Sequence, residues 1–202
     1  MTKPTRAFIF DLDGTLADTM PAHFVAWSKV VARRGLTFPE ARFYALGGVP
    51  TAKIAAMLIA EAGLAHDPEE VALEKEQTYY DGLTDGGIRP IEPVLALARS
   101  HHEGNEGPLA VASGSVRRLV TRTLEALGIA HWFGAVVAAE DTARHKPEPD
   151  VFLEAARRIG ADAALCTVYE DTDIGLEAAR RAGMQGVDVR PLIAAATRKP
   201  GG

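Results

Sequence analysis

The stretch Ala7-Phe8-Ile9-Phe10-Asp11-Leu12-Asp13-Gly14-Thr15 joins a continuous apolar run to two aspartates and a glycine. A short apolar run that stops at a turn is typical of a strand buried on both faces of a sheet. Side chains alternate along an extended chain, so Asp11 and Asp13 approach the same side just beyond this strand. Two neighbouring carboxylates repel each other, and a bound cation is the simplest way to keep both ionised near neutral pH. Gly14 then allows the sharp exit from the strand.

Four more apolar runs follow, separated by helical patterns. The runs cover 109–112, 135–138, 165–169 and 186–189, and the helical patterns cover 116–127, 148–159 and 174–182. Strands that alternate with helices predict βαβ units and a parallel sheet covered on both faces, so the fold class is α/β. His101 and His102 precede a Glu-Gly-Asn stretch and are expected in a solvated loop. The tail from Pro191 is expected to be frayed.

The segment 17–86 interrupts this alternation directly after the first strand. It contains no convincing strand, and its apolar spacing predicts helices at 21–34, 39–45, 51–62 and 68–81. The turn-rich stretch Thr84-Asp85-Gly86-Gly87 suits a hinge where the chain returns to the sheet. We therefore predict a core domain of residues 1–16 and 87–202 and an all-helical insertion of residues 17–86.

Composition and charge limit the class of protein. The formal net charge of −5 disfavours a nucleic-acid partner. The single cysteine, Cys166, cannot form an intramolecular disulfide and suits a reducing compartment. The longest uncharged apolar run, 54–60, is far shorter than the ~18 residues that a membrane span needs. We expect a cytoplasmic protein without a membrane or nucleic-acid partner.

Three further motifs follow later strands, where a parallel sheet brings the carboxyl ends of its strands together. Ser113 and Gly114 lie between a strand and a helix, so a hydroxyl and backbone N–H groups there form an anion site. Lys146 precedes a helix and could neutralise a phosphate beside the two aspartates. Glu170 and Asp171 could complete an all-oxygen site suited to Mg²⁺. Taken singly, these motifs also suit a helix cap, a solvated lysine and a surface acid cluster, but their order along the chain favours one site.

Together with the stretch 11–19, these motifs resemble the four motifs of the haloacid dehalogenase-like (HAD) hydrolase superfamily, over essentially the whole chain. The insertion resembles the small C1-type helical cap of the β-phosphoglucomutase-like subgroup. Within that subgroup, Ala22-His23-Phe24-Val25-Ala26-Trp27 and His145-Lys146-Pro147 are most similar to fructose-1-phosphatase-like members. The resemblance implies a Rossmann-like parallel-sheet core with an inserted all-helical cap.

The resemblance also implies a reaction through an aspartyl-phosphate. Asp11 corresponds to the nucleophile that attacks phosphorus, and Asp13 to the acid that protonates the leaving alcohol and then activates water. Mg²⁺ is expected on the Asp11 carboxylate, the Asp13 backbone carbonyl and the Asp171 carboxylate. Glu170 corresponds to a residue that orients its neighbours rather than one that binds the ion.

The remaining matches concern the phosphate and the cap. Ser113, the Gly114 N–H and Lys146 correspond to the groups that hold the transferring phosphoryl group. His23 lies where mutase-like relatives have a cap-hinge histidine, which helps to couple closure of the cap to Asp13. A packing role is an equally good interpretation of this residue.

The cap loop separates two possible activities. Mutase-like relatives carry a lysine and an arginine there to grip a second phosphate, whereas the matching positions in this chain are Gly47 and Thr51, with Lys53 as a possible substitute. This difference favours a Mg²⁺-dependent phosphatase that hydrolyses a small sugar monophosphate such as fructose 1-phosphate. As a separate expectation, we take the enzyme to be a monomer or a weak oligomer.

Three other activities are compatible with parts of this sequence. β-Phosphoglucomutase is the alternative within the subgroup. A dehalogenase would share the fold, but Asp13 suits a phosphoryl leaving group better. A non-catalytic phospho-acceptor or phosphate-binding module is the alternative from another class, and the long insertion argues against it, because such a module needs no lid.

Overall fold

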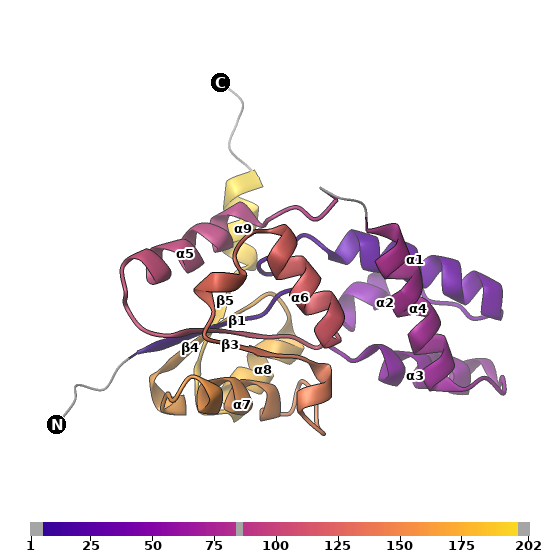
Figure 1. The fold of residues 1–202 in the computed structure, drawn as a ribbon. Helices are drawn as coiled ribbons and strands as arrows, with labels where there is room; N and C mark the ends of the chain where they lie inside the picture. Colours follow the sequence, from indigo (N-terminus) through magenta and orange to yellow (C-terminus); the bar gives the residue numbers. More distant parts are fainter. Residues whose placement is uncertain (1–5, 84–86, 198–202) are drawn as a thin grey trace.

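The computed structural model describes residues 6–83 and 87–197, in which one sheet runs through the centre of a layered α/β core (Figure 1). The sheet has five parallel strands in the order β3-β2-β1-β4-β5. They are β1 (Ala7–Phe10), β2 (Leu109–Ala112), β3 (Ala135–Val137), β4 (Cys166–Glu170) and β5 (Gln185–Asp188). The predicted α/β fold is confirmed. Because β1 is central, the aspartates that follow it lie at the middle of the carboxyl edge of the sheet.

Helices cover both faces of the sheet. One face carries α5 (Glu92–Glu103), α6 (Arg117–Ala126) and α9 (Arg190–Thr197), and the other carries α7 (Asp150–Arg158) and α8 (Asp173–Arg181). Phe8 and Phe10 of β1 pack into the first layer, whereas Ala7 and Ile9 pack into the second. Both faces of β1 are therefore apolar, which explains its unbroken apolar run. Short 3₁₀ turns lie at Ala130–Trp132, Ala139–Asp141 and Ala163–Leu165.

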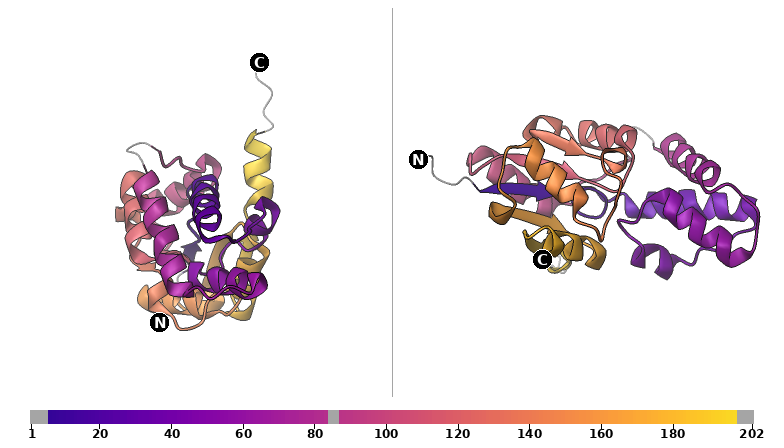
Figure 2. Two further views of the ribbon diagram at one scale, coloured as in Figure 1. Left: turned by 90° about the vertical axis from the view of Figure 1, so that its right-hand side faces the viewer. Right: turned by 90° about the horizontal axis from the view of Figure 1, so that it is seen from below.

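Four helices inserted between β1 and β2 form a cap with an apolar core of its own. They are α1 (Met20–Arg34), α2 (Glu40–Ala45), α3 (Thr51–Ala62) and α4 (Pro68–Gly82), and they lie beyond one end of the sheet (Figures 1 and 2). Buried side chains such as Trp27, Phe43 and Leu58 fill this core. The predicted helical insertion is confirmed, while Thr84-Asp85-Gly86 of the predicted hinge lies outside the described residues. None of the described helices is long and apolar enough to cross a membrane.

A seam between α4 and α6 holds the cap against the core. Tyr79 and Leu83 at the end of α4 pack against Leu119 of α6. Beside them, the Arg118 guanidinium lies 3.7 Å from the centre of the Tyr80 ring. This contact keeps the cap over the carboxyl edge of the sheet.

The structure corrects two expectations. Residues 190–197 form α9 rather than a frayed tail from Pro191. His101 is in the last turn of α5 rather than in a solvated loop, and its ring stacks on Phe8 at 3.7 Å between ring centres. Its two nitrogens lie 2.8 Å from Glu106 and from the Tyr169 hydroxyl. The polar residues that follow His101 suggested a loop. In fact the helix continues through this residue, and its side chain faces the sheet.

This packing predicts that His101→Ala destabilises the protein. The substitution removes a stacked ring and leaves the largely buried Tyr169 hydroxyl without its partner, so we expect a loss of about 2 kcal/mol in the free energy of unfolding. Urea denaturation measures the change. His102→Ala is the control, because the ring contacts of His102 are with the half-buried Trp132 and with the exposed His131 rather than with the sheet. Equal losses for the two variants would contradict the structural role of His101.

Candidate active site

Three carboxylates converge around one lysine at the carboxyl edge of the sheet. One carboxylate oxygen each from Asp11, Glu170 and Asp171 lies within 4.8 Å of the others. Lys146 Nζ donates hydrogen bonds to Asp11 Oδ1 at 2.6 Å and to Glu170 Oε2 at 2.7 Å. Three acids and one ammonium group leave this cluster, which we call the acid cluster, with surplus negative charge. Its all-oxygen donor set fits a hard divalent cation.

Burial and mutual repulsion control the protonation of the acid cluster. Burial raises the pKa of Asp11 well above its ordinary value, the charge of Glu170 raises it further, and Lys146 opposes both. Burial and Glu170 also raise the pKa of Asp171 to about 7. A bound cation would favour the ionised form of each group.

Gly14 allows the tight approach of Asp171. Gly14 has a φ of +92°, and an added Cβ would lie only 2.4 Å from Asp171 Oδ2. The next residue, Thr15, donates its hydroxyl to Asp171 Oδ1 at 2.8 Å. The predicted sharp exit after β1 is confirmed, and it also serves to bring the β1 and β4 loops together.

The Glu170 carboxylate accepts hydrogen bonds from its own loop and from Lys146. Besides Lys146, its carboxylate accepts hydrogen bonds from the Thr172 backbone N–H at 3.1 Å and from the Thr172 hydroxyl at 2.8 Å. The side chain is buried. These contacts fix the start of α8 and the position of Lys146.

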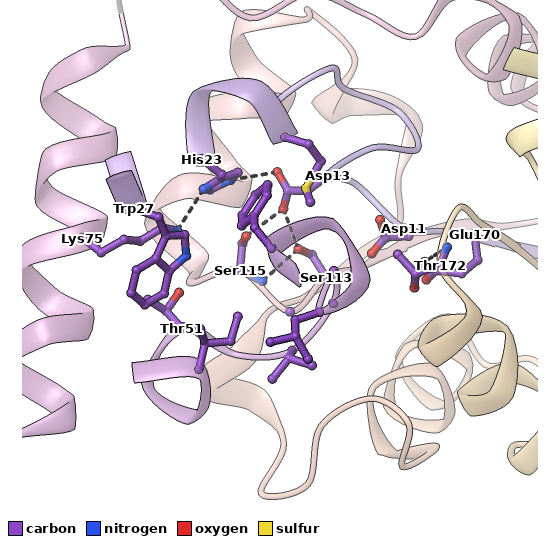
Figure 3. A pocket seen from close by; sticks show the side chains of 18 residues that line it. Asp11, Asp13, His23, Trp27, Thr51, Lys75, Ser113, Ser115, Glu170 and Thr172 are labelled. Carbon is purple, nitrogen blue, oxygen red and sulfur yellow. Dashed lines mark hydrogen bonds and ion pairs between the residues drawn. The ribbon is translucent and has the colours of Figure 1, made fainter. Parts of the chain in front are cut away.

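A second cluster surrounds Asp13, whose carboxylate points toward the cap (Figure 3). It accepts hydrogen bonds from the hydroxyls of Thr19 at 2.6 Å, Ser115 at 2.7 Å and Ser113 at 3.3 Å. His23 Nε2 lies 3.4 Å from Asp13 Oδ1, the oxygen that also accepts the Thr19 hydroxyl. Burial alone would raise the pKa of Asp13, but the hydrogen bonds from His23, Thr19 and Ser115 hold it below the ordinary value. Asp13 is therefore ionised in this structure.

A buried lysine orients His23 toward Asp13. Lys75 Nζ on α4 lies 2.9 Å from His23 Nδ1, and an ammonium group can only donate. Nδ1 therefore accepts, and the proton on Nε2 faces Asp13. Burial and the charge of Lys75 lower the pKa of His23, which keeps the ring neutral near pH 7. The Tyr79 ring stacks on this imidazole with 3.8 Å between ring centres.

Sequence reasoning missed Ser115, Lys75 and Tyr79 as parts of this site. Lys75 did carry a signal, because it lies on the buried face of α4 with Val71 and Tyr79, where a charged side chain is unusual. Ser115 gave none, because a serine after Ser-Gly at a helix start is typical of an ordinary cap.

A cavity of about 60 Å³ lies between the two clusters, on the side that the cap covers. The core lines it with Asp11, Asp13, Ser113, Gly114, Ser115, Glu170 and Thr172, and the cap with Met20, His23, Trp27, Phe43, Leu46, Gly47, Gly48, Val49, Thr51, Ile54 and Lys75. The cap loop touches the loop after β2, since a Cβ added at Gly114 would lie 2.8 Å from the Gly48 carbonyl oxygen.

The structure brings the predicted site residues together, except for Lys53. Asp11, Lys146, Glu170 and Asp171 form the acid cluster, and Asp13, His23 and Ser113 meet beside it. Lys53 is exposed and is not among the described residues that line the cavity. The cation that the cap supplies to the cavity is Lys75 instead.

Comparisons with known proteins show which family the chain resembles over most of its length. A family model described as haloacid dehalogenase-like hydrolase matches residues 5–183. The chain is 41% identical over 184 residues to the fructose-1-phosphate phosphatase YqaB of Escherichia coli (strain K12), covering 91% of this chain and 96% of that relative. It is 27% identical over 197 residues to the β-phosphoglucomutase of Bacillus subtilis (strain 168), covering 94% and 87%. A solved β-phosphoglucomutase from Clostridium difficile aligns with a TM-score of 0.80 at 26% identity, covering 91% and 84%.

Proposed function

Since the chain belongs to the haloacid dehalogenase-like hydrolase family and is an enzyme of the phosphatase type, we propose that it hydrolyses a small sugar monophosphate similar to fructose 1-phosphate. The observation that carries the proposal is that the acid cluster and Asp13 meet at one cavity, which Asp11, Asp13 and Glu170 line. The similarity to the Escherichia coli fructose-1-phosphate phosphatase supports the substrate class. We further propose that the enzyme acts in the cytoplasm as a monomer or a weak oligomer, with residues 17–86 as the cap.

Two displacements at phosphorus make up the proposed reaction. In the first, an Asp11 carboxylate oxygen bonds to phosphorus, the bond from phosphorus to the sugar oxygen breaks, and Asp13 gives that oxygen a proton. In the second, Asp13 takes a proton from water, the water oxygen bonds to phosphorus, and Asp11 is released. The final products are the free sugar and inorganic phosphate.

Asp13 has to gain a proton before the first displacement. Its hydroxyl and imidazole donors keep it ionised in this structure. A phosphate anion that binds beside it would raise its pKa, because like charges favour the protonated acid. Ser113 and Ser115 could then turn from Asp13 to the incoming substrate.

The phosphoryl group would rest against Ser113, the Gly114 N–H and Lys146. Ser113 and Gly114 lie on the loop after β2 and line the cavity, and Lys146 reaches it through its contact with Asp11. Phosphoryl transfer depends mostly on such positioning and on electrostatics. Lys146 is buried, and burial alone would lower its pKa. The charges of Asp11 and Glu170 raise this pKa above its ordinary value, so the side chain remains a cation throughout the usual pH range.

The acid cluster suits Mg²⁺. We propose that the carboxylates of Asp11 and Asp171 and the backbone carbonyl of Asp13 hold the ion, with Glu170 keeping Lys146 and the β4 loop in position. When bound, Mg²⁺ offsets the repulsion between carboxylate and phosphate and stabilises the charge that develops in transfer.

β-Phosphoglucomutase activity is the second candidate, because relatives with that name align over most of the chain. Gly47 argues against it. A Cβ added there would lie 3.0 Å from Thr172 Cγ2 and 3.3 Å from the Tyr44 carbonyl oxygen, so the closed cap has little room for a lysine at this position. A coupled assay that finds glucose 6-phosphate as the main product of β-glucose 1-phosphate would favour the mutase.

Phosphate release from a panel of hexose and pentose phosphates, with Mg²⁺ or with excess chelator, tests the proposed function. We expect Mg²⁺-dependent release, with fructose 1-phosphate or a related hexose phosphate among the best substrates. No release from any sugar phosphate would contradict the substrate class, and full release in chelator would contradict the metal.

Lys75→Met is expected to lower turnover of a sugar phosphate by about 10–100-fold, because His23 loses the donor that fixes its tautomer toward Asp13. The effect on an aryl phosphate should be smaller, since an aryl leaving group needs little protonation. Burial lowers the pKa of Lys75 to about 8, so its charge is lost as the pH rises through that value. The wild type should therefore lose activity above about pH 8, and this limb of the pH profile should be absent from the variant.

The control for this test is Lys29→Met, which removes an exposed lysine from α1. Equal losses on sugar and aryl phosphates in Lys75→Met would contradict a role through Asp13.

A further inference from the structure

A second hollow continues the catalytic cavity along the seam between cap and core. It has a volume of about 270 Å³, and Thr51 and Gly114 line both spaces. Small-molecule sites usually have volumes of ~300–1,000 Å³, so the cavity of about 60 Å³ at Asp11 and Asp13 is too small for a whole sugar phosphate. The part of the substrate beyond the reacting phosphate therefore has room in this hollow, past Thr51.

The charged side chains that line the hollow are mainly carboxylates. Glu69, Glu76 and Glu140 contribute to it, and His145 is the one basic group among its described lining residues. Burial and the nearby Lys53 lower the pKa of His145, so this ring is neutral near pH 7. Glu140 is partly engaged, because it accepts the Arg117 backbone N–H at the start of α6.

Glu76 interacts with Thr51, one of the two residues that line both spaces. It follows Lys75 on α4 and is half-buried. Burial raises its pKa, while the charge of Lys75 and a hydrogen bond from the Thr51 side chain lower it in part. Arg118 also faces it, but this guanidinium lies against the Tyr80 ring. Figure 3 shows Thr51 on the cap side of the catalytic cavity, near Trp27 and Lys75.

We propose that Glu76 is a specificity-determining residue, whose carboxylate behind Thr51 excludes substrates with a second phosphate and leaves the hollow to the neutral, hydroxyl-bearing end of a sugar monophosphate. This inference rests on the proposed function, because it takes the cavity between Asp11 and Asp13 as the phosphoryl site. A second anion in the hollow would meet like charge, and like charges placed together are an effective means of rejecting a wrong ligand. Carboxylates also accept hydrogen bonds from sugar hydroxyls.

The test compares kcat/KM for fructose 1,6-bisphosphate with kcat/KM for fructose 1-phosphate, measured as phosphate release in Mg²⁺. Glu76→Gln keeps the shape of the side chain and removes its charge. In Glu76→Gln we expect the ratio of kcat/KM for the bisphosphate to kcat/KM for the monophosphate to rise at least about tenfold. In the wild type this ratio should rise with salt concentration, because ions screen the repulsion between Glu76 and the second phosphate. The matched control is Glu70→Gln, which removes an equal charge from the exposed side of α4 and should leave the ratio as in the wild type.

A second pair of substrates separates this inference from the proposed function. 4-Nitrophenyl phosphate and 4-carboxyphenyl phosphate differ by one remote anion, and neither is a sugar. If sugar phosphates are not hydrolysed, the proposed function fails, and the same comparison of ratios on the aryl pair still tests Glu76. Glu76→Ala, checked by thermal melting, provides a second charge-removing variant should Glu76→Gln fold poorly. An unchanged ratio in folded Glu76 variants, or an equal rise in Glu70→Gln, would overturn the inference.

Discussion

Asp11→Asn is expected to abolish phosphate release, with a loss of at least about 10⁴-fold in kcat, because an amide does not attack phosphorus. The fold should persist. Asp11 is buried beside Glu170, Asp171 and Asp13, so removing its charge relieves repulsion, and Lys146 keeps its contact with Glu170. Steady-state phosphate release measures the loss, and a thermal melt in the absence of metal should show a midpoint no lower than that of the wild type.

The control is Asp18→Asn, which makes the same chemical change a short distance along the chain, where the carboxylate pairs with the exposed Arg89. This variant should retain activity close to that of the wild type. Near-wild-type turnover in Asp11→Asn would contradict the nucleophilic mechanism.

Asp171→Ala is expected to raise the Mg²⁺ concentration needed for half-maximal activity by at least about 10²-fold, or to abolish activity. Asp171 contributes one of the three converging carboxylates, and Gly14 and Thr15 hold it in place. Calorimetric titration of Mg²⁺ gives a second measurement that does not depend on turnover. Ca²⁺ should support turnover poorly, because it prefers more ligands in a looser geometry.

Asp173→Ala is the matched control for the metal site. Asp173 lies two residues further on, is highly exposed and pairs with Arg190. Mg²⁺ binding of Asp171→Ala equal to that of the control would remove Asp171 from the metal site.

The fold could be predicted because burial leaves a plain pattern. β1 and β2 coincide with their apolar runs, since a strand covered by helices on both faces has no polar side to interrupt it. The apolar pattern did not predict α9. Among the described side chains of this helix, Ile193 is the one that packs against the hydrophobic core, so the sequence shows no regular apolar spacing there.

The site could be predicted in part, for a different reason. Asp11, Asp13, Lys146 and Asp171 follow strands whose carboxyl ends a parallel sheet must bring together. Lys75 reaches the site from a cap helix, and its place depends on how the cap closes on the core, which no local pattern encodes.

The measurement that tests the central claim most directly is hydrolysis of fructose 1-phosphate in oxygen-18-labelled water with Mg²⁺, followed by mass spectrometry of the products. If the sugar leaves first and water then attacks the phosphorus atom of phosphorylated Asp11, the bond from phosphorus to Asp11 breaks, and inorganic phosphate should appear with one labelled oxygen per molecule. Unlabelled phosphate on a second sugar position, without release of labelled inorganic phosphate, would show transfer back to sugar and would contradict the account.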